Sequence, residues 1–203
     1  MKLRFITSLF FISSFVFSPS AQLTIAIQPF GTFDTGLIAV ITPEIVKQFD
    51  SAAVVILPAQ KLPQAAYYKP RSRYRAEILL EKLDSINSNR HTKILGLTNK
   101  DISTTKGGVY DWGIFGLGGL GTAPCVVSTF RMKKNGTPEL FLQRLRKVVV
   151  HELGHTFGLG HCDWPRCVML DYRGTIASLD NTGFGFCSQC RARLRGYIGK
   201  LRQ

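Results

Sequence analysis

The sequence predicts an α+β fold, with a mixed β-sheet, two amphipathic helices and a small cysteine-rich C-terminal subdomain. Three observations lead to this prediction. The 203 residues, 45% of them hydrophobic, are enough for one domain with a buried core. Strand-like and helix-like segments alternate up to residue 158, as in α+β domains. Four of the five cysteines follow, in a region where apolar periodicity fades.

The N-terminal segment, residues 1–20, has the three-part pattern of a secretory signal peptide. Two basic residues precede an apolar run over residues 5–17, and small residues suit cleavage after Ser20. The run is shorter than the roughly 20 residues that a membrane span needs. We therefore expect an exported protein, periplasmic or secreted, whose mature chain is a single domain over residues 21–203 without a transmembrane span. An uncleaved anchor or a hydrophobic first strand is the alternative.

The N-terminal subdomain, residues 21–158, holds the predicted sheet. Thr42 as a cap, with a proline directly after it, predicts a short helix through Phe49. Apolar residues at three- and four-residue spacing predict an amphipathic helix over about 73–87. Five glycines within residues 113–121 predict a loop. Strands are predicted at residues 23–30, 53–57, 93–97, 109–115 and 125–132.

A longer helix is predicted over residues 138–157. Thr137 is a suitable cap, and a proline and a glutamate follow in the first turn, where both are favoured. Gly158 stops the helix, because glycine accepts the left-handed conformation common at helix ends. The C-terminal subdomain, residues 159–203, is expected to be irregular and ends in a basic tail.

The residues HELGHTFGLGH at 151–161 predict a metal site. His151 and His155 lie four apart, so both point from one face of the helix. A turn at Gly158 can bring His161 back as a third ligand. Three imidazoles suit zinc and leave one coordination position for water, which is typical of a catalytic site. Glu152 lies beside the first ligand, where a general base for that water is needed.

Four cysteines after the histidines form a second candidate metal site. Cys162 and Cys167 make one pair, and Cys187 and Cys190 make the other, a spacing typical of tetrahedral zinc bound by four thiolates. Two disulfides are the alternative, because export would bring the chain into an oxidising compartment. Cys125 lies in a predicted strand and is expected to be a buried free thiol.

The histidine and cysteine patterns together resemble one family. The residues fit the pattern HExxHxxGxxHC-x4-CxM-x17-CxxC, which is similar to the signature of the archaemetzincins in the metzincin clan of zinc peptidases. The segments AYYKPRSRYRA at 66–76 and VVSTFR at 126–131 also look similar to that family.

The resemblance implies a metzincin-like fold, with a twisted mixed sheet, a backing helix at about 73–88 and an active-site helix at 138–157. It implies two zinc ions per chain, one catalytic and one structural that the four cysteines bind in the C-terminal subdomain. Met169 would lie in a Met-turn, as an apolar floor below the histidines. The strand around Val126–Phe130 would be the sheet edge along which a peptide substrate extends.

The leading hypothesis is a zinc-dependent metallopeptidase, with a peptide or protein as substrate and Glu152 as general base. Tyr172 is a candidate for stabilising the oxyanion, although a tyrosine three residues after Met169 could equally serve packing. The alternative function is a zinc-stabilised protein, catalytically weak or inactive, that holds peptides without cleaving them. The sequence is silent on the particular substrate and on oligomeric state.

The chain is strongly basic, with 26 Lys and Arg against 13 Asp and Glu and a formal net charge of +13. Such a charge favours anionic partners. We expect no nucleic-acid partner, because the basic residues are scattered and no nucleic-acid-binding module is recognisable. A weak attraction to anionic surfaces is the simpler expectation.

Overall fold

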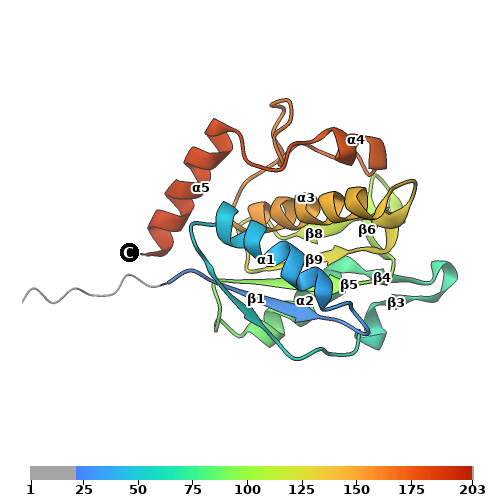
Figure 1. Cartoon of the computed structure of the whole chain (residues 1–203). Coiled ribbons are helices and arrows are strands. Elements are labelled where there is room, and N and C mark those ends of the chain that lie inside the picture. The colour runs from blue at the N-terminus through green and yellow to red at the C-terminus, as the bar shows by residue number, and fades with distance from the viewer. Residues whose placement is uncertain (1–21, 203) are drawn as a thin grey trace, which may run out of the picture.

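The main sheet has five strands and is mixed. The computed structural model describes residues 22–202, so the predicted signal peptide lies outside the described residues. The strand order is β2 (Ala53–Ile56), β1 (Thr24–Pro29), β5 (Lys93–Thr98), β9 (Pro124–Ser128) and β8 (Gly116–Gly118). The first four strands run parallel, whereas β8 pairs antiparallel with β9 and forms the edge. This confirms the predicted α+β class with a mixed sheet (Figure 1).

A second, four-stranded sheet is a feature that the sequence did not predict. Its strand order is β3 (Tyr67–Tyr68), β4 (Arg73–Arg75), β6 (Ile102–Lys106) and β7 (Val109–Ile114). Partly buried ion pairs link these short polar strands, since Arg73 of β4 binds Asp101, just before β6, and Asp111 of β7. The basic, aromatic segment before residue 76 therefore forms strand and ion pairs, and the helix predicted from residue 73 begins at Ala76 instead.

Helices cover both faces of the main sheet (Figure 1). The helices α1 (Gly36–Gln48) and α3 (Pro138–Thr156) pack on one face, and α2 (Ala76–Asn87) packs on the other. The strands supply alternate residues to the two cores, as their pleat requires. Ile25 and Ile27 of β1 face α1 and α3, and Ala26 between them faces α2.

The helix α1 begins at Gly36, so the predicted start at Thr42 is wrong. The hydroxyl of Thr42 donates to the carbonyl of Ile38 at 2.8 Å and caps nothing, and the following proline lies inside the helix. Ile38, Ile41 and Ile45 are buried at helical spacing. Packing of this apolar stripe on the sheet outweighs the low helix propensity of β-branched residues and the proline.

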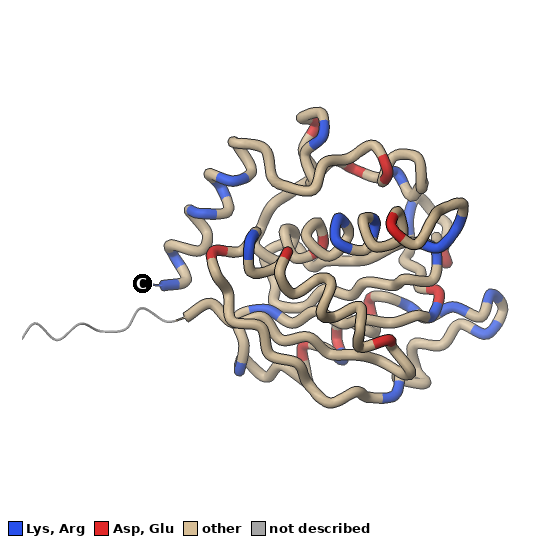
Figure 2. The backbone as a smooth tube through the Cα atoms, viewed as in Figure 1, with Lys and Arg blue, Asp and Glu red and all other residues tan. Residues whose placement is uncertain are grey.

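The C-terminal subdomain contains two helices, so the prediction of an irregular tail is also wrong. These are α4 (Ile176–Asn181) and α5 (Ser188–Leu201). The helix α5 buries Cys190, Leu194 and Ile198 at four-residue spacing, and its other faces carry Arg and Lys with no acidic residue (Figure 2). Short 3-10 helices complete the fold, at Gln64–Ala66 (η1), Lys69–Arg71 (η2) and Phe130–Lys133 (η3).

Among residues 22–202, no helix has the length and apolar character needed to cross a bilayer.

Candidate active site and cysteine cluster

The helix α3 carries the first histidines and has the two ends that the sequence predicts. Its N-terminus is capped by Thr137, whose hydroxyl accepts the N–H of Leu140 at 3.3 Å. After its C-terminus Gly158 adopts φ +80°, a conformation that strains any residue with a Cβ. The N–H of Leu159 then bonds back to the carbonyl of Gly154 at 3.1 Å. This turn sends the chain back toward the helix.

The turn assembles the histidine cluster, His151, His155 and His161. Each residue offers one ring nitrogen, and these atoms lie within 4.8 Å of one another. Burial lowers the pKa of His151 well below its usual value, and burial also lowers the pKa of His155. Both rings are therefore neutral at pH 7, which is the form that binds metals.

The hydrogen bonds of the first two rings make the cluster suitable for a cation. Nδ1 of His151 lies 2.7 Å from the carbonyl of Val168, and Nδ1 of His155 lies 2.7 Å from that of Leu159. A carbonyl accepts only, so each Nδ1 must carry the proton and each Nε2 a lone pair. The two Nε2 atoms are 3.0 Å apart. Two lone pairs at this distance repel each other unless a positive ion lies between them, so the donor set fits zinc.

The histidine cluster lies on a cleft of about 400 Å³, which Glu152 also lines. Burial raises the pKa of Glu152 to about 8, although a hydrogen bond from the backbone N–H of Gly118 opposes the shift. Strand β8 lies very close to this side chain. A Cβ on Gly116 would be 2.6 Å from Cγ of Glu152, so any larger residue there would push the carboxyl group away. The strand thus fixes where the carboxyl group lies.

Met169 and Tyr172 both lie close to the histidines. Met169 is fully buried. Its sulfur lies against Gly154, the residue of α3 just before His155. The ring of Tyr172 lies 4.3 Å from that of His151, and its hydroxyl lies 3.2 Å from the carbonyl of Val168. The hydroxyl of Tyr172 is thus engaged with the backbone, which matches the packing alternative for this residue.

The four cysteines that the sequence singled out also come together, as the cysteine cluster (Cys162, Cys167, Cys187 and Cys190). Their sulfurs lie within 4.8 Å of one another, and none forms a disulfide. Sγ of Cys162 and Sγ of Cys187 are 3.8 Å apart. Sulfurs at the corners of a tetrahedral zinc site are about 3.8 Å apart, whereas a disulfide brings them to about 2.05 Å. The arrangement fits a tetrahedral zinc site, and the four cysteines are free thiols in this structure.

Backbone N–H groups point at three of these sulfurs. Trp164 donates to Cys162 at 3.4 Å, and Cys187 donates to Cys167 at 3.4 Å. Burial opposes ionisation of Cys187, but the N–H of Cys190 and the neighbouring thiols lower the pKa of Cys187 to about 7. Such donors stabilise thiolates, which are the form that binds zinc. Cys125 is buried elsewhere in the core, as predicted.

Three features of the cleft were missed in the sequence. The edge of the main sheet is β8, whereas β9 lies between β5 and β8, so the expectation that Val126–Phe130 forms the edge is wrong. The predicted glycine loop contains this edge strand. The hairpin of β6 and β7 adds Lys106 and Trp112 to the lining, and Asp171 lies 4.0 Å from Nδ1 of His161. The second sheet brings Lys106 and Trp112 to the cleft, so no short-range pattern in the sequence marks these two residues.

The fold and the two clusters define a class of protein, the zinc metallopeptidases. Comparison with known proteins narrows this class. The chain belongs to peptidase family M54, whose profile matches residues 46–196. It is 35% identical to the archaemetzincin of Haloquadratum walsbyi over 149 residues, which are 70% of this chain and 82% of that one. It is 32% identical to the archaemetzincin of Archaeoglobus fulgidus over 173 residues, 85% of this chain and 99% of the other.

Solved structures agree. The crystal structure of the Methanopyrus kandleri archaemetzincin matches with a TM-score of 0.78 and 28% identity, over 91% of this chain and 99% of that one. The Archaeoglobus fulgidus archaemetzincin, complexed with malonate, matches with a TM-score of 0.70 and 31% identity, over 84% of this chain and 99% of that one. The expected metallopeptidase fold and family are thereby confirmed.

Proposed function

We propose that this chain hydrolyses peptide bonds with Glu152 as the general base, on a zinc ion held by His151, His155 and His161. The observation that carries the proposal is the pair of facing Nε2 lone pairs 3.0 Å apart, both fixed by backbone carbonyls on Nδ1. When bound, zinc lowers the pKa of its water to about 7 and polarises the substrate carbonyl.

Glu152 is suited to move a proton. Its carboxyl group is held between α3 and β8, next to the first histidine, and lines the cleft. Burial raises the pKa of this group, and positive charge at the histidines would favour its ionised form. Glu152 would accept the proton of the attacking water and then pass it to the leaving amine.

The edge strand β8 is the proposed binding surface for the peptide. Gly116–Gly118 line the cleft, and β8 has one neighbour, β9, in the main sheet of the described residues. Its other edge can therefore pair with an extended peptide, as in other cases of strand addition. Met169, buried against the active-site helix, would keep the histidine turns in place from below.

The second part of the proposal is a structural zinc ion in the cysteine cluster. Four thiolates complete a tetrahedral site, so this ion would have no open position for chemistry. The sulfur spacing and the N–H groups aimed at the sulfurs support it. It would tie the loop after the active-site helix to the start of α5.

Export through a signal peptide at residues 1–20 also remains a proposal, supported by the sequence alone. The mass of the purified protein from a cell envelope or culture fraction tests it. Loss of 20 residues supports export, and an intact chain found inside the cell overturns it.

Elemental analysis combined with a peptide library tests the peptidase proposal. We expect two zinc ions per chain in the wild type, and one in His155→Ala and in Cys190→Ala. The wild type should cleave members of a broad peptide library, and His155→Ala should cleave none. Full cleavage by His155→Ala, or a protein that cannot take up zinc, would overturn the proposal.

A further inference from the structure

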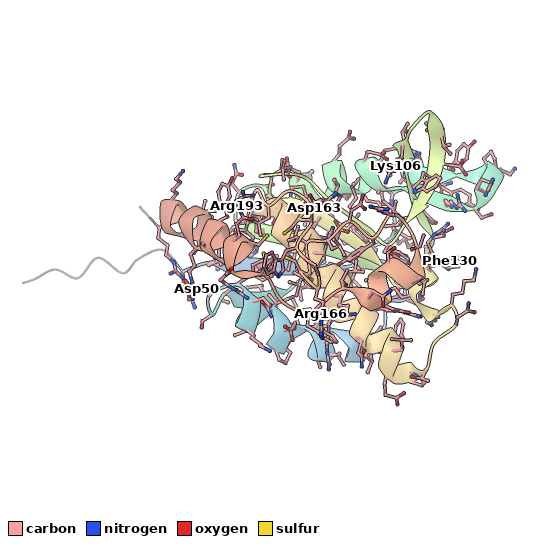
Figure 3. The ribbon with its side chains drawn as sticks, turned by 90° about the horizontal axis from the view of Figure 1, so that it is seen from above. Asp50, Lys106, Phe130, Asp163, Arg166 and Arg193 are labelled. Carbon is pink, nitrogen blue, oxygen red and sulfur yellow. The ribbon has the colours of Figure 1, made fainter. Side chains whose placement is uncertain are left out.

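A second cavity opens beside the catalytic cleft. Its volume is about 550 Å³, and Phe115 and Gly174 line both spaces. We call it the basic cavity, because Arg73, Arg131 and Lys134 line it against a single carboxylate, that of Asp101. Its rim includes Phe130, which lies on the side of the molecule remote from Arg193 of α5 (Figure 3).

We infer that the basic cavity binds a carboxylate of the substrate on the C-terminal side of the scissile bond. The carboxylate comes either from an Asp or Glu side chain or from the C-terminus of a short peptide. This inference rests on the proposed peptidase function, and it adds a substrate class to it: peptides that are acidic after the cleaved bond.

Arg131 presents free hydrogen-bond donors in a fixed position. Its Nε lies 2.6 Å and its Nη2 2.9 Å from the two carboxylate oxygens of Asp101. Its guanidinium also lies against Gly113, where a Cβ would collide with it. Its Nη1 has no hydrogen-bond partner within residues 22–202, and the side chain is 29% exposed. Arginine thus keeps part of its planar fork for a second carboxylate.

Lys134 is the other free cation. Its side chain is exposed, and the described part of the chain provides no partner for its ammonium group. Its backbone, however, is held firmly. The buried Arg144 donates to the carbonyls of Met132 at 2.8 Å and Lys134 at 2.7 Å, and Asp180 fixes Arg144 in turn. A firmly held backbone lowers the entropy lost when the lysine side chain binds a ligand.

The charges around the basic cavity do not cancel. Arg73 pairs with Asp101 through Nε and with Asp111 through Nη1, and Asp111 is also 3.6 Å from Arg71. The two carboxylates therefore face four cations, namely Arg71, Arg73, Arg131 and Lys134. Among the residues that line the cavity itself, three cations face one carboxylate, and this excess of positive charge favours an anionic group.

Strand pairing sets the direction of the peptide. An antiparallel partner is the more stable one for β8. Such a peptide runs from Gly118 toward Gly116, so its C-terminal half continues past Phe115 into the basic cavity. Arg131 contacts Gly113, three residues before the glycine that faces Glu152. Phe115 forms a bend between β7 and β8, so this separation is at most about 10 Å, and the carboxylate belongs within about three residues after the cleaved bond.

Binding of labelled peptides to zinc-loaded Glu152→Gln protein, followed by fluorescence anisotropy, tests the inference without requiring turnover. The peptides of one pair carry either Glu or Gln near the C-terminal end. The peptides of the other pair have either a free or an amidated C-terminus. We expect the acidic member to bind about fivefold tighter, as for partly exposed charge pairs, and high salt to remove the difference. Comparing the two pairs separates a side-chain carboxylate from a terminal one.

Two neighbouring lysines provide the matched variants. Lys134→Gln, added to Glu152→Gln, should weaken the preference for acid, with Arg131 supplying what remains. Lys133→Gln should keep it, because Lys133 lies over the ring of Phe141 and does not line the basic cavity. Equal binding of both peptides, no binding of either, or equal effects of the two lysine variants would overturn the inference, as would a preference for acid at the N-terminal end.

Cleavage by the wild type, measured on the same peptides, separates the two proposals. Cleavage without a preference for acid overturns the basic cavity as a subsite and leaves the peptidase intact. A preference for acidic peptides in binding, combined with no cleavage, supports the basic cavity as a binding site and overturns the proposed peptidase function.

Discussion

The histidine cluster and the cysteine cluster adjoin in the sequence at residues 161 and 162, yet they differ in what surrounds them. The histidines line a cleft of about 400 Å³, and His161 is half exposed. The cysteines are absent from that lining, and Cys167 and Cys190 are 1% and 2% exposed. Three ligands beside a cleft leave room for a reacting group, whereas four ligands in a closed shell do not. The surroundings of the histidines therefore suit catalysis, and those of the adjoining cysteines suit a structural site.

The two clusters also differ in what holds their ligands in place. Backbone carbonyls orient the histidine rings of α3, a helix packed on the main sheet. The cysteines instead join a loop to the first turn of α5. We therefore expect metal loss to affect activity at the first cluster and stability at the second. Four variants test this contrast.

Cys190→Ala should give the largest effect. Removing one ligand should release one zinc ion per chain and lower the free energy of unfolding by about 5 kcal/mol, since loss of a metal is among the most damaging changes. For a chain of this size that is a fall in Tm of about 15 °C. Thermal melting and zinc analysis measure both quantities.

Cys125→Ala is the matched control for this cysteine. It removes a buried thiol outside the cluster and should cost about 1 kcal/mol with no loss of zinc. Equal zinc content in Cys190→Ala and the wild type would show that the cysteines hold no metal.

Glu152→Gln, at the histidine cluster, should lower activity and leave stability unchanged. Without a group that can take the proton, turnover should fall about 10³-fold, while zinc content and Tm stay unchanged. Steady-state kinetics on a cleaved peptide measure the loss. Glu139→Gln, at the exposed start of the same helix, is the control and should keep the wild-type rate. A Glu152→Gln variant that works at the wild-type rate would remove Glu152 from the mechanism.

The sequence was sufficient for both clusters, because local spacing determines them. The helix face and one turn at Gly158 place the histidines, and two short cysteine pairs form the second set. It was insufficient where distant residues decide the structure. The glycines of β8 read as a loop, since a strand without side chains has no alternation, yet they are glycines because α3 lies against them.

The helices show the same limit. The sequence gives α3 correctly, because its cap, first-turn proline and terminal glycine are local signals. It misses the start of α1, which depends on packing Ile38 and Ile41 against the sheet. It also misses α5. Of the three buried residues of this helix, Cys190 was interpreted only as a metal ligand, and Leu194 and Ile198 were assigned to an irregular tail.

Lys93→Met tests how the sheet supports the helix of the histidine cluster. The ammonium of Lys93 in β5 donates to the carbonyls of Thr156, at the end of α3, at 2.6 Å and of Thr122 at 3.0 Å. Burial lowers the pKa of Lys93 to about 8. Between pH 8 and 10.5 the unfolded chain thus binds more protons than the folded one. Wild-type stability should rise across this range, by up to about 3 kcal/mol.

Urea unfolding at several pH values measures this slope. Lys93→Met should lack this contribution, whereas Lys200→Met, on the exposed face of α5, should keep it. A slope that is the same in all three proteins would mean that Lys93 does not cause it, and hence that its pKa is not lowered in the folded chain.

Gly116→Ala should give the smallest effect, and it tests how closely the edge strand positions the base. The new methyl group would lie 2.6 Å from Cγ and 2.8 Å from Oε1 of Glu152, so the carboxyl group must shift by a fraction of an ångström. Misplaced catalytic groups cost rate before they cost binding, so kcat should fall about tenfold with KM and zinc content little changed. Gly160 lines the same cleft, but a Cβ there would meet no atom within 4 Å. The control variant Gly160→Ala should therefore keep the wild-type kcat. If both variants lose kcat equally, the cleft tolerates no added methyl group anywhere, and contact with β8 is not what positions Glu152.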